Sequence, residues 1–237
     1  MDAEKIQTPK QVKEFYEGFH GRICLRESLK FNRWLLKILK IKPGMRLLDI
    51  ACGGGYLVAE AKKNGLACYG VDISERALGI AAQQAGQERF VASDAEHLPW
   101  RDNYFDLVTC LGSLEHFISP AKALNEMVRV AKDDASICIL VPNLFSWENI
   151  KKVQKTGQAP THGQELERFA TRQQWQELLE ASKLKVKRVV KYNGFPRLLE
   201  IKNGIPKIRS LRKFFGRFFI PFNLCSSFIF ICEKKYE

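Results

Sequence analysis

The chain has 237 residues, of which 46% are hydrophobic, 27% charged and 11% aromatic, and its formal net charge is +12. This composition is typical of a globular protein and argues against disordered, collagenous and fibrous classes. A chain of this length buries enough surface for one domain of generous size without a disulfide or a metal to stabilise its core.

The N-terminal region is polar and then helical. Its first fifteen residues lack the apolar core of a signal peptide, which predicts a cytoplasmic protein. Apolar and basic residues alternate at helical spacing over Leu25–Ile41, and the pattern ends at the Pro43-Gly44 turn. We therefore expect a separate N-terminal helical region over residues 1–41, followed by the main domain over residues 42–237.

From Met45 onward, short apolar runs alternate with helical patterns. The runs typical of buried strands are Arg46–Ala51, Ala67–Val71, Arg89–Val91, Phe105–Leu111 and Ser136–Val141. The helical patterns between them are Tyr56–Asn64, Ser74–Ala85 and Pro120–Ala131, with Ser74 and Ser119 as predicted N-caps. This alternation predicts an α/β fold with a parallel sheet.

The C-terminal part continues the pattern with longer connections. Helices are expected from Ser146 to about Gln154 and from Thr171 to about Ala181, and two further strands near Val186–Tyr192 and Ser226–Cys232. Residues 143–170 and 193–225 remain as insertions. The second insertion is long for a strand connection, and long connections are usually functional.

The basic charge is local. Twelve basic residues and one acid lie between Ser182 and Arg217, which accounts for +11 of the net charge. Within this segment, residues 205–219 project as a basic amphipathic helix, a pattern typical of contact with a membrane surface. Two alternatives stay open: packing of the aromatic face on the sheet edge, and a nucleic-acid surface.

Cysteines and histidines give no sign of a metal site. The seven cysteines contain no Cys-x-x-Cys pair and mostly lie in apolar runs, as expected of buried thiols in a reducing compartment. The four histidines have no zinc-ligand spacing to any cysteine pair, so no metal is expected.

The strongest chemical signal is the segment LLDIACGGGYL, in which a strand ends near Asp49 and a glycine loop leads into a helix. Glycines there allow a ligand to approach the backbone. Asp72 and Asp94 follow the ends of the next two strands. Because the carboxyl ends of parallel strands share one edge of the sheet, these acids are expected around one nucleoside-shaped crevice.

A dinucleotide-binding fold is the main rival interpretation. Its Gly-x-Gly-x-x-Gly fingerprint would place a third glycine at position 58, where this chain has Val58. Asp49 would also repel a pyrophosphate, but it suits a cationic amino-acid group. The expected ligand is a nucleoside joined to an amino acid, and S-adenosylmethionine fits that description.

Four ordered motifs resemble those of class I S-adenosylmethionine-dependent methyltransferases, in particular the small-molecule subfamily called type 11. They are KPGMRLLDIACGGGYL at Lys42–Leu57, YGVDIS at Tyr69–Ser74, SDAEHLPW at Ser93–Trp100 and FDLVTCLGSLEHF at Phe105–Phe117. The resemblance covers about Lys42 to Asn143. It implies a Rossmann-like seven-stranded, mostly parallel sheet flanked by helices, with the basic insertion before the last strand.

The resemblance also implies roles for individual residues. Asp49 and the loop of Ala51, Cys52, Gly53, Gly55 and Tyr56 would lie against the methionine part of S-adenosylmethionine, and Asp72 would bind its ribose hydroxyls. Ile73, Asp94 and Ala95 would surround the adenine, and Leu111 and His116 would line the boundary with the acceptor. Tyr16, in a stretch that resembles the cofactor lid of relatives, would cover the cofactor. Relatives most often have glycine at the position of Ala51, where a methyl group would slightly loosen the contact.

An oxygen acceptor needs a general base, and Glu115, His116 and His162 are the candidates. His116 alternatively packs at the cofactor edge, His162 alternatively is solvated, and Tyr16 alternatively is a core aromatic. Cys52 and Cys110 are expected to be core thiols.

The sequence thus predicts an S-adenosylmethionine-dependent methyltransferase. It would transfer a methyl group to an oxygen or carbon atom of a small, hydrophobic acceptor and release S-adenosylhomocysteine. Two alternatives stay open. One is an RNA methyltransferase that uses residues 182–217, and the other is a non-catalytic binding module with the same fold, against which the intact set of acids and glycines argues.

Overall fold

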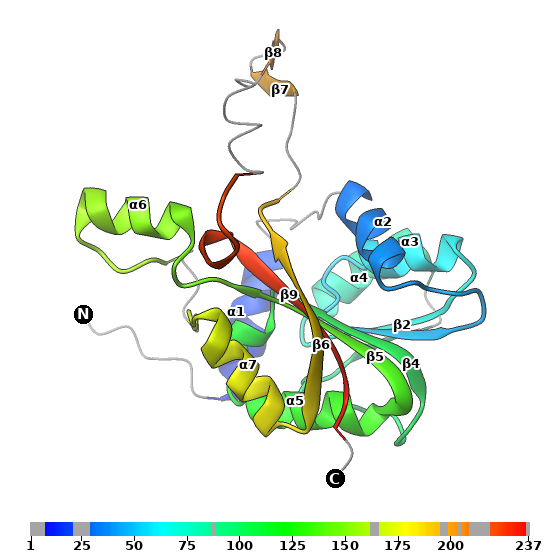
Figure 1. The fold of residues 1–237 in the computed structure, drawn as a ribbon. Helices are drawn as coiled ribbons and strands as arrows, with labels where there is room; N and C mark the ends of the chain where they lie inside the picture. Colours follow the sequence, from blue (N-terminus) through cyan, green and yellow to red (C-terminus); the bar gives the residue numbers. More distant parts are fainter. Residues whose placement is uncertain are drawn as a thin grey trace.

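A computed structural model describes residues 8–20, 29–86, 89–161, 166–194, 199–202, 205–208 and 219–235. Its centre is a seven-stranded sheet in the order β3-β2-β1-β4-β5-β9-β6 (Figure 1). The strands are β1 (Arg46–Ile50), β2 (Ala67–Asp72), β3 (Phe90–Ala92), β4 (Phe105–Leu111), β5 (Ala131–Pro142), β6 (Leu184–Tyr192) and β9 (Ser227–Lys234). β9 pairs antiparallel with β5 and β6, and the other pairs are parallel. The predicted mostly parallel α/β sheet is confirmed.

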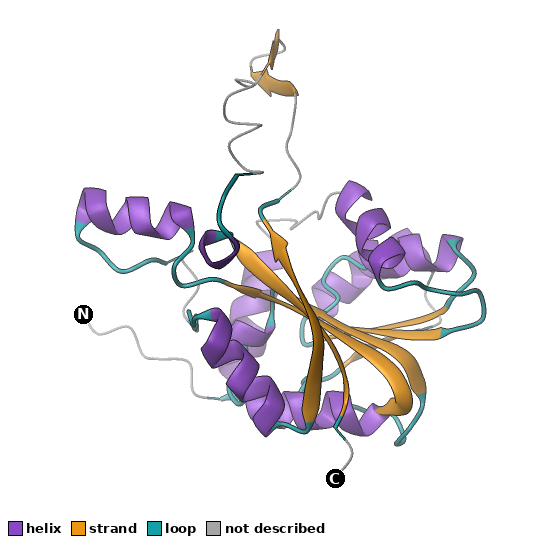
Figure 2. Ribbon diagram, in the orientation of Figure 1, coloured by secondary structure: helices purple, strands orange, loops and turns teal. Residues whose placement is uncertain are grey.

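Helices cover both faces of this sheet (Figure 2). They are α1 (Pro9–His20), α2 (Leu29–Ile38), α3 (Tyr56–Lys63), α4 (Glu75–Ala85), α5 (Pro120–Val130), α6 (Trp147–Thr156) and α7 (Arg172–Ala181), with the 3-10 turns η1 (Leu114–His116) and η2 (Phe222–Leu224). α2 and α3 pack on one face, and α5 and α7 on the other. In the part of the chain that is described, every helix is too short or too polar to cross a membrane.

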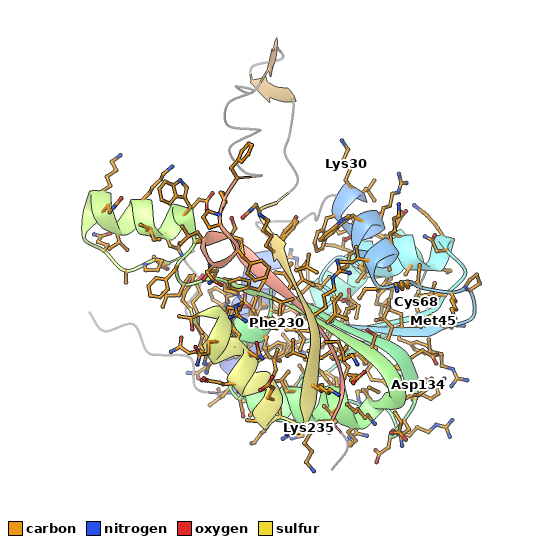
Figure 3. All side chains as sticks on the ribbon, in the orientation of Figure 1. Lys30, Met45, Cys68, Asp134, Phe230 and Lys235 are labelled. Atoms are coloured by element: carbon orange, nitrogen blue, oxygen red, sulfur yellow. The ribbon has the colours of Figure 1, made fainter. Side chains whose placement is uncertain are left out.

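Side chains that alternate between the two faces of each strand divide the apolar core into two clusters, one on each face of the sheet. Leu47 and Leu107 face the core under α2 and α3, whereas their neighbours Leu48 and Val108 face the core under α5 and α7. This follows from the two-residue period of a strand, which sends successive side chains to opposite faces. In Figure 3, Phe230 of β9 lies within the body of the molecule. Both faces of the sheet are therefore buried beneath helices, as expected of parallel strands.

Helix boundaries follow the predicted caps closely. The Ser74 hydroxyl accepts a hydrogen bond from the Ala77 amide, and Thr171 forms a capping box with Gln174. Ser119 stands at the N-cap before Pro120 as predicted, but its side chain makes no capping bond. Its amide instead donates to Glu96 Oε1 at 2.6 Å.

The basic insertion differs from the expectation. Residues Ile205–Ile208 form strand β8, which pairs antiparallel with β7 (Leu199–Lys202) in a hairpin that projects away from the sheet in Figure 1. The prediction of a helix that begins at Ile205 is therefore wrong. Ile205 and Ile208 are three positions apart, a spacing that favours a helix, and the pairing of this segment with β7 overrides that preference. Residues 209–218 of the predicted helix lie outside the described residues.

Candidate functional site

The main cavity lies at the carboxyl edge of the parallel strands and encloses about 1310 Å³ including its open mouth. Twelve of the thirteen residues expected around the cofactor line it: Tyr16, Asp49, Ala51, Cys52, Gly53, Tyr56, Asp72, Ile73, Asp94, Ala95, Leu111 and His116. The structure therefore brings together residues that are up to 100 positions apart in the chain.

The glycine loop between β1 and α3 forms the floor of the cavity through its backbone. Gly53 and Gly55 have φ values of 50° and 70°, a region that favours glycine. Gly53 and Gly54 line the cavity, so a ligand there would meet main chain with little side chain in between.

Ala51 adopts the same left-handed conformation, with φ at 53°. For an L-residue this conformation costs about 1–2 kcal/mol because Cβ crowds the following carbonyl oxygen. The sequence suggested a small contact effect at this position. The structure adds a backbone cost, which explains physically why glycine suits the position better.

Gly55 is the expected cofactor residue that does not line the cavity. A Cβ added there would lie 2.7 Å from Ala81 Cβ, so this glycine allows the loop to pack closely on α4. Its place in the structure is that of a packing residue.

Asp72 is fixed at the end of β2 by two backbone amides. Oδ2 accepts from Gly53 N at 2.8 Å, and Oδ1 accepts from Ser74 N at 2.9 Å. The side chain is buried yet borders the cavity. Because each carboxylate oxygen has a further lone pair, this arrangement orients the group while leaving it able to accept from a ligand.

Asp49 lies deeper, at the end of β1. Its Oδ1 accepts from the Thr109 hydroxyl at 2.6 Å. Burial raises the pKa of Asp49 to about 7, although the Thr109 bond lowers it; the nearby Asp72 raises it further. A cationic group next to Asp49 would favour its ionised form.

The third acidic strand end forms a chain of contacts that the sequence did not reveal. Asp94 Oδ1 accepts from Glu96 N at 3.0 Å, and Glu96 Oε1 accepts from Ser119 N. Glu96 also lines the cavity. We find no sequence signal for Glu96, because its role depends on where α5 begins.

Helix α1 forms one wall through Pro9, Val12 and Tyr16, which share one face of the helix. The adjoining face of the helix attaches α1 to the start of α4: Lys13 Nζ lies 2.5 Å from Glu75 Oε1, and Glu17 Oε1 accepts from the Glu75 backbone amide. Burial raises the pKa of Tyr16, and the nearby acids Glu115 and Asp72 raise it further. The spacing of Pro9 and Val12 from Tyr16 was the signal that would have found them.

At the other end of the cavity, η1 presents His116. Its Nδ1 lies 2.5 Å from the carbonyl oxygen of Leu166. Since a carbonyl only accepts, Nδ1 carries the hydrogen in this contact, and in the neutral ring Nε2 is then the atom that can take a proton.

Glu115 is beside His116 but does not line the cavity. Its Oε1 lies 3.8 Å from His116 Nε2, and its buried Oε2 makes no hydrogen bond with any described group. Burial raises the pKa of Glu115 to about 8, so the two side chains form an ion pair only when His116 is protonated and Glu115 ionised. His162, the third predicted base, lies outside the described residues.

Arg168 fixes the loop that follows η1. Its guanidinium donates to the carbonyl oxygens of Glu115, Phe117 and Ile118, and its amide donates to Glu115 O. Burial lowers the pKa of Arg168. Sequence reasoning missed this residue, because an arginine that binds carbonyls fifty positions away leaves no local pattern.

The electrostatic character of the cavity is the reverse of that of the whole chain. Asp49, Asp72, Asp94 and Glu96 line it, and no lysine or arginine is among its described lining residues. The chain as a whole has 38 basic and 26 acidic residues. The cavity therefore suits a cationic or hydroxyl-rich ligand and disfavours a phosphate.

Comparison with known proteins agrees with this geometry. Residues 48–139 match a family model described as a methyltransferase domain. Norajmaline N-methyltransferase from Rauvolfia serpentina is 41% identical over 106 residues, which are 42% of this chain and 36% of that protein. Demethylmenaquinone methyltransferase from Mycolicibacterium paratuberculosis is 33% identical over 144 residues, 58% of this chain and 62% of that protein. The chain thus spans between about a third and three fifths of these relatives.

Solved structures share the fold over most of the chain. YcgJ from Bacillus subtilis has a TM-score of 0.58 at 21% identity, covering 87% of this chain and 98% of YcgJ. The [4+2]-cyclase SpnF has a TM-score of 0.68 at 16% identity, covering 98% of this chain and 99% of SpnF. At these identities the likeness concerns the fold alone.

Proposed function

We propose that the protein is a class I S-adenosylmethionine-dependent methyltransferase of the type 11 family and that it methylates a small, apolar acceptor at oxygen or carbon. Residues 48–139 match a family model described as a methyltransferase domain, which supports this proposal. The observation that carries the proposal is the acidic cavity beside a glycine loop. S-adenosylmethionine is a nucleoside with a sulfonium and an amino-acid group and no phosphate. This chemistry fits a cavity lined by four carboxylates, with no lysine or arginine among the lining residues that the structure describes.

The proposed binding roles follow from the positions of the acids. Asp72, oriented by two amides, would accept from the ribose hydroxyls, and Asp94 would accept from the exocyclic amine of the adenine. Asp49 would pair with the methionine amino group, next to the backbone of Gly53. Ile73 and Ala95 would pack on the adenine.

The chemistry supplied by the bound cofactor is an electrophilic methyl group. The protein would align an acceptor with that methyl group and exclude water. Helix α1 closes one side of the cavity, so we propose that the N-terminal region, residues 1–41, acts as a lid with Tyr16 on its inner face. Pro9 and Val12 add apolar surface there.

We propose His116 as the general base. Its contact with the Leu166 carbonyl places the hydrogen of the neutral ring on Nδ1, so Nε2 is the nitrogen that would take the acceptor's proton. Glu115 would become ionised as His116 becomes charged, since the raised pKa of Glu115 places its titration near neutral pH. Leu111, Phe117 and Ile118 provide the apolar surroundings that an apolar acceptor needs.

The acceptor class has support from relatives of known activity. A demethylmenaquinone methyltransferase and a norajmaline N-methyltransferase are named for small-molecule acceptors. We extend that class to this chain, with residues 143–170 and 193–225 as the segments that would select the acceptor. The six cysteines in the described part of the chain are buried and unpaired, which supports a reducing compartment such as the cytoplasm.

An RNA methyltransferase is the second candidate, because most of the excess positive charge lies in residues 182–217. It predicts RNA binding that weakens steeply with salt. A catalytically inactive binding module is the third candidate, and it predicts no transfer to any acceptor.

The first experiment is calorimetric titration with S-adenosylmethionine and S-adenosylhomocysteine. Binding of both is expected, and the absence of binding would refute the cofactor assignment. The second is transfer of a labelled methyl group to a panel of phenols, quinols and activated carbon acids.

In that assay, His116→Asn keeps a donor for the Leu166 carbonyl but removes the base, so a loss of about 10²–10⁴-fold in rate is expected. The matched control is His97→Asn, because His97 is exposed. Equal rates in the two variants would exclude His116 as base.

A further inference from the structure

Exposed aromatic side chains gather at one place on the molecule. The described residues expose seven large apolar side chains, and five of them lie in two short segments: Phe145, Trp147, Val153, Phe219 and Phe222. We call these five the aromatic surface. Phe219 is 82% exposed and Phe145 53% exposed, which is costly in water unless a partner covers them.

The two segments are adjacent although they are about seventy positions apart. The side-chain amide of Asn143 donates through Nδ2 to the carbonyl oxygens of Asn223 and Cys225, at 2.9 and 2.8 Å respectively. The Ser226 hydroxyl also donates to Glu148 Oε2 at 3.3 Å. These bonds fix the start of α6 against η2, so the aromatic surface is one surface of the folded protein.

Basic side chains surround the aromatic surface. Lys151 Nζ lies 4.9 Å from the centre of the Trp147 ring, and Lys155 is exposed one turn further along α6. Lys191 Nζ donates to Ile220 O at 3.0 Å, and Arg172 Nε donates to Asn223 Oδ1 at 3.3 Å. Residues 144–156 contain three lysines and one glutamate, and residues 219–226 contain no charge.

We propose that the aromatic surface is a docking site for an anionic lipid membrane. Tryptophan and phenylalanine insert at the boundary between headgroups and acyl chains, and lysines around them bind anionic headgroups while their stems lie along the apolar region. Lysine is depleted in protein–protein interfaces, so this mixture favours a membrane over a protein partner.

The aromatic surface lies at the same edge of the sheet as the cavity. β5 ends at Pro142, just before Asn143, and β9 begins at Ser227, so both segments lie at the carboxyl edge of the sheet, the same edge as the cavity. If the proposed function is right, an apolar acceptor dissolved in the membrane would reach the cavity from the side on which the protein docks. The docking itself does not depend on catalysis.

The test is cosedimentation of the full chain with vesicles of phosphatidylcholine alone and with added phosphatidylglycerol. Binding only to the anionic vesicles is expected. Trp147→Ser/Phe219→Ser and Lys151→Glu/Lys155→Glu should each weaken binding by about tenfold or more. The matched controls, Leu29→Ser/Val91→Ser and Lys37→Glu/Lys42→Glu, change exposed residues elsewhere on the molecule and should shift vesicle binding by less than about twofold.

A second readout reports contact directly. Brominated lipids should quench fluorescence from Trp147, and Trp147→Phe should remove most of that quenching, because the other three tryptophans are buried or half-buried. Calorimetry with S-adenosylmethionine on each variant checks the fold and tests the cofactor site separately. Failure of cofactor binding with intact vesicle binding would overturn only the proposed function.

Three outcomes would overturn the membrane proposal. They are equal binding to neutral and anionic vesicles by wild type and variants, sedimentation without quenching, and binding to single-stranded RNA but not to vesicles. The last would favour the nucleic-acid interpretation of the basic residues.

Discussion

The two halves of the cavity are fixed by different kinds of contact. In the half proposed to bind the cofactor, formed by the glycine loop and the ends of β1 to β3, Asp49 and Asp72 are bound by groups of the same or a neighbouring strand or of the loops that follow, such as the two amides on Asp72. In the acceptor half, formed by residues 111–118, the His116 loop is fixed by Leu166 and Arg168 from a distant insertion. The first half is a property of the sheet. The second depends on a segment that can change without disturbing the sheet.

The largest expected effect is in the cofactor half. In the proposed binding mode, Asp72→Ala would remove two charge-assisted hydrogen bonds to the ribose, each worth roughly 1.5–3 kcal/mol, so affinity for S-adenosylmethionine should fall by about 10²-fold or more in calorimetry. Asp102→Ala is the control, since Asp102 is an exposed acid paired with Arg129. An unchanged affinity in Asp72→Ala would contradict the assignment of the ribose site.

The next effect tests the acceptor half. Arg168→Ala leaves three carbonyl oxygens without their guanidinium donor, and the loss in unfolding free energy should be about 2–4 kcal/mol in urea denaturation. Affinity for S-adenosylmethionine should change by less than about threefold, given the separation of the two halves. Arg76→Ala, at an exposed position on α4, is the control. A large loss of cofactor affinity in Arg168→Ala would show that the halves are coupled.

The third prediction concerns pH and Asp49. In the folded apo-protein its pKa is about 7, and in the unfolded chain it is near 3.8, so between these values the folded state binds more protons. The free energy of unfolding therefore falls as pH rises from about 4 to about 7, and Glu115 extends the fall to about 8.

Cofactor binding should reverse the protonation of Asp49. A cationic amino group next to it favours the ionised form, so S-adenosylmethionine should release a proton from Asp49 on binding at about pH 6, where the amino group is already charged in the free cofactor. Calorimetry in buffers of different ionisation enthalpy measures the number of protons released per cofactor bound. Asp49→Asn should abolish this release. Release that persists in Asp49→Asn would assign the proton to another group.

The smallest effect is at Ala51. Ala51→Gly relieves the left-handed strain but makes the unfolded chain more flexible, so the net gain in stability should be at most about 1 kcal/mol. Ala59→Gly, in the middle of α3, should instead lose about 1 kcal/mol. Thermal unfolding distinguishes the two, and a loss in both variants would mean that Ala51 is not strained.

The contrast between contacts near the strand ends and contacts from distant segments also separates the features that the sequence predicts from those that it does not. Strand ends such as Asp49 and Asp72 follow apolar runs whose length and order are visible in the sequence. Six of the seven strands of the main sheet lie within two residues of the predicted bounds, and β5 begins at Ala131, five residues earlier than predicted. Thr109 and Arg168 were not found, because each acts on a residue at least fifty positions away. The sequence predicts a helix from Ile205, but residues 205–208 form strand β8, because a segment of four residues carries too little periodicity to outweigh its pairing with β7.

The hydrogen bond from Ser226 N to Asn193 Oδ1, at 2.9 Å across 33 positions, has an evolutionary consequence. It closes the base of the long insertion at the point where β6 and β9 begin to pair through Tyr192 and Ser227. Whatever lies between those two residues can be lengthened, shortened or exchanged at a closure cost that grows only with the logarithm of its length. The insertion can thus be exchanged while the pairing register of β6 and β9 is retained, and under the proposed function such an exchange would give the same sheet a new acceptor preference.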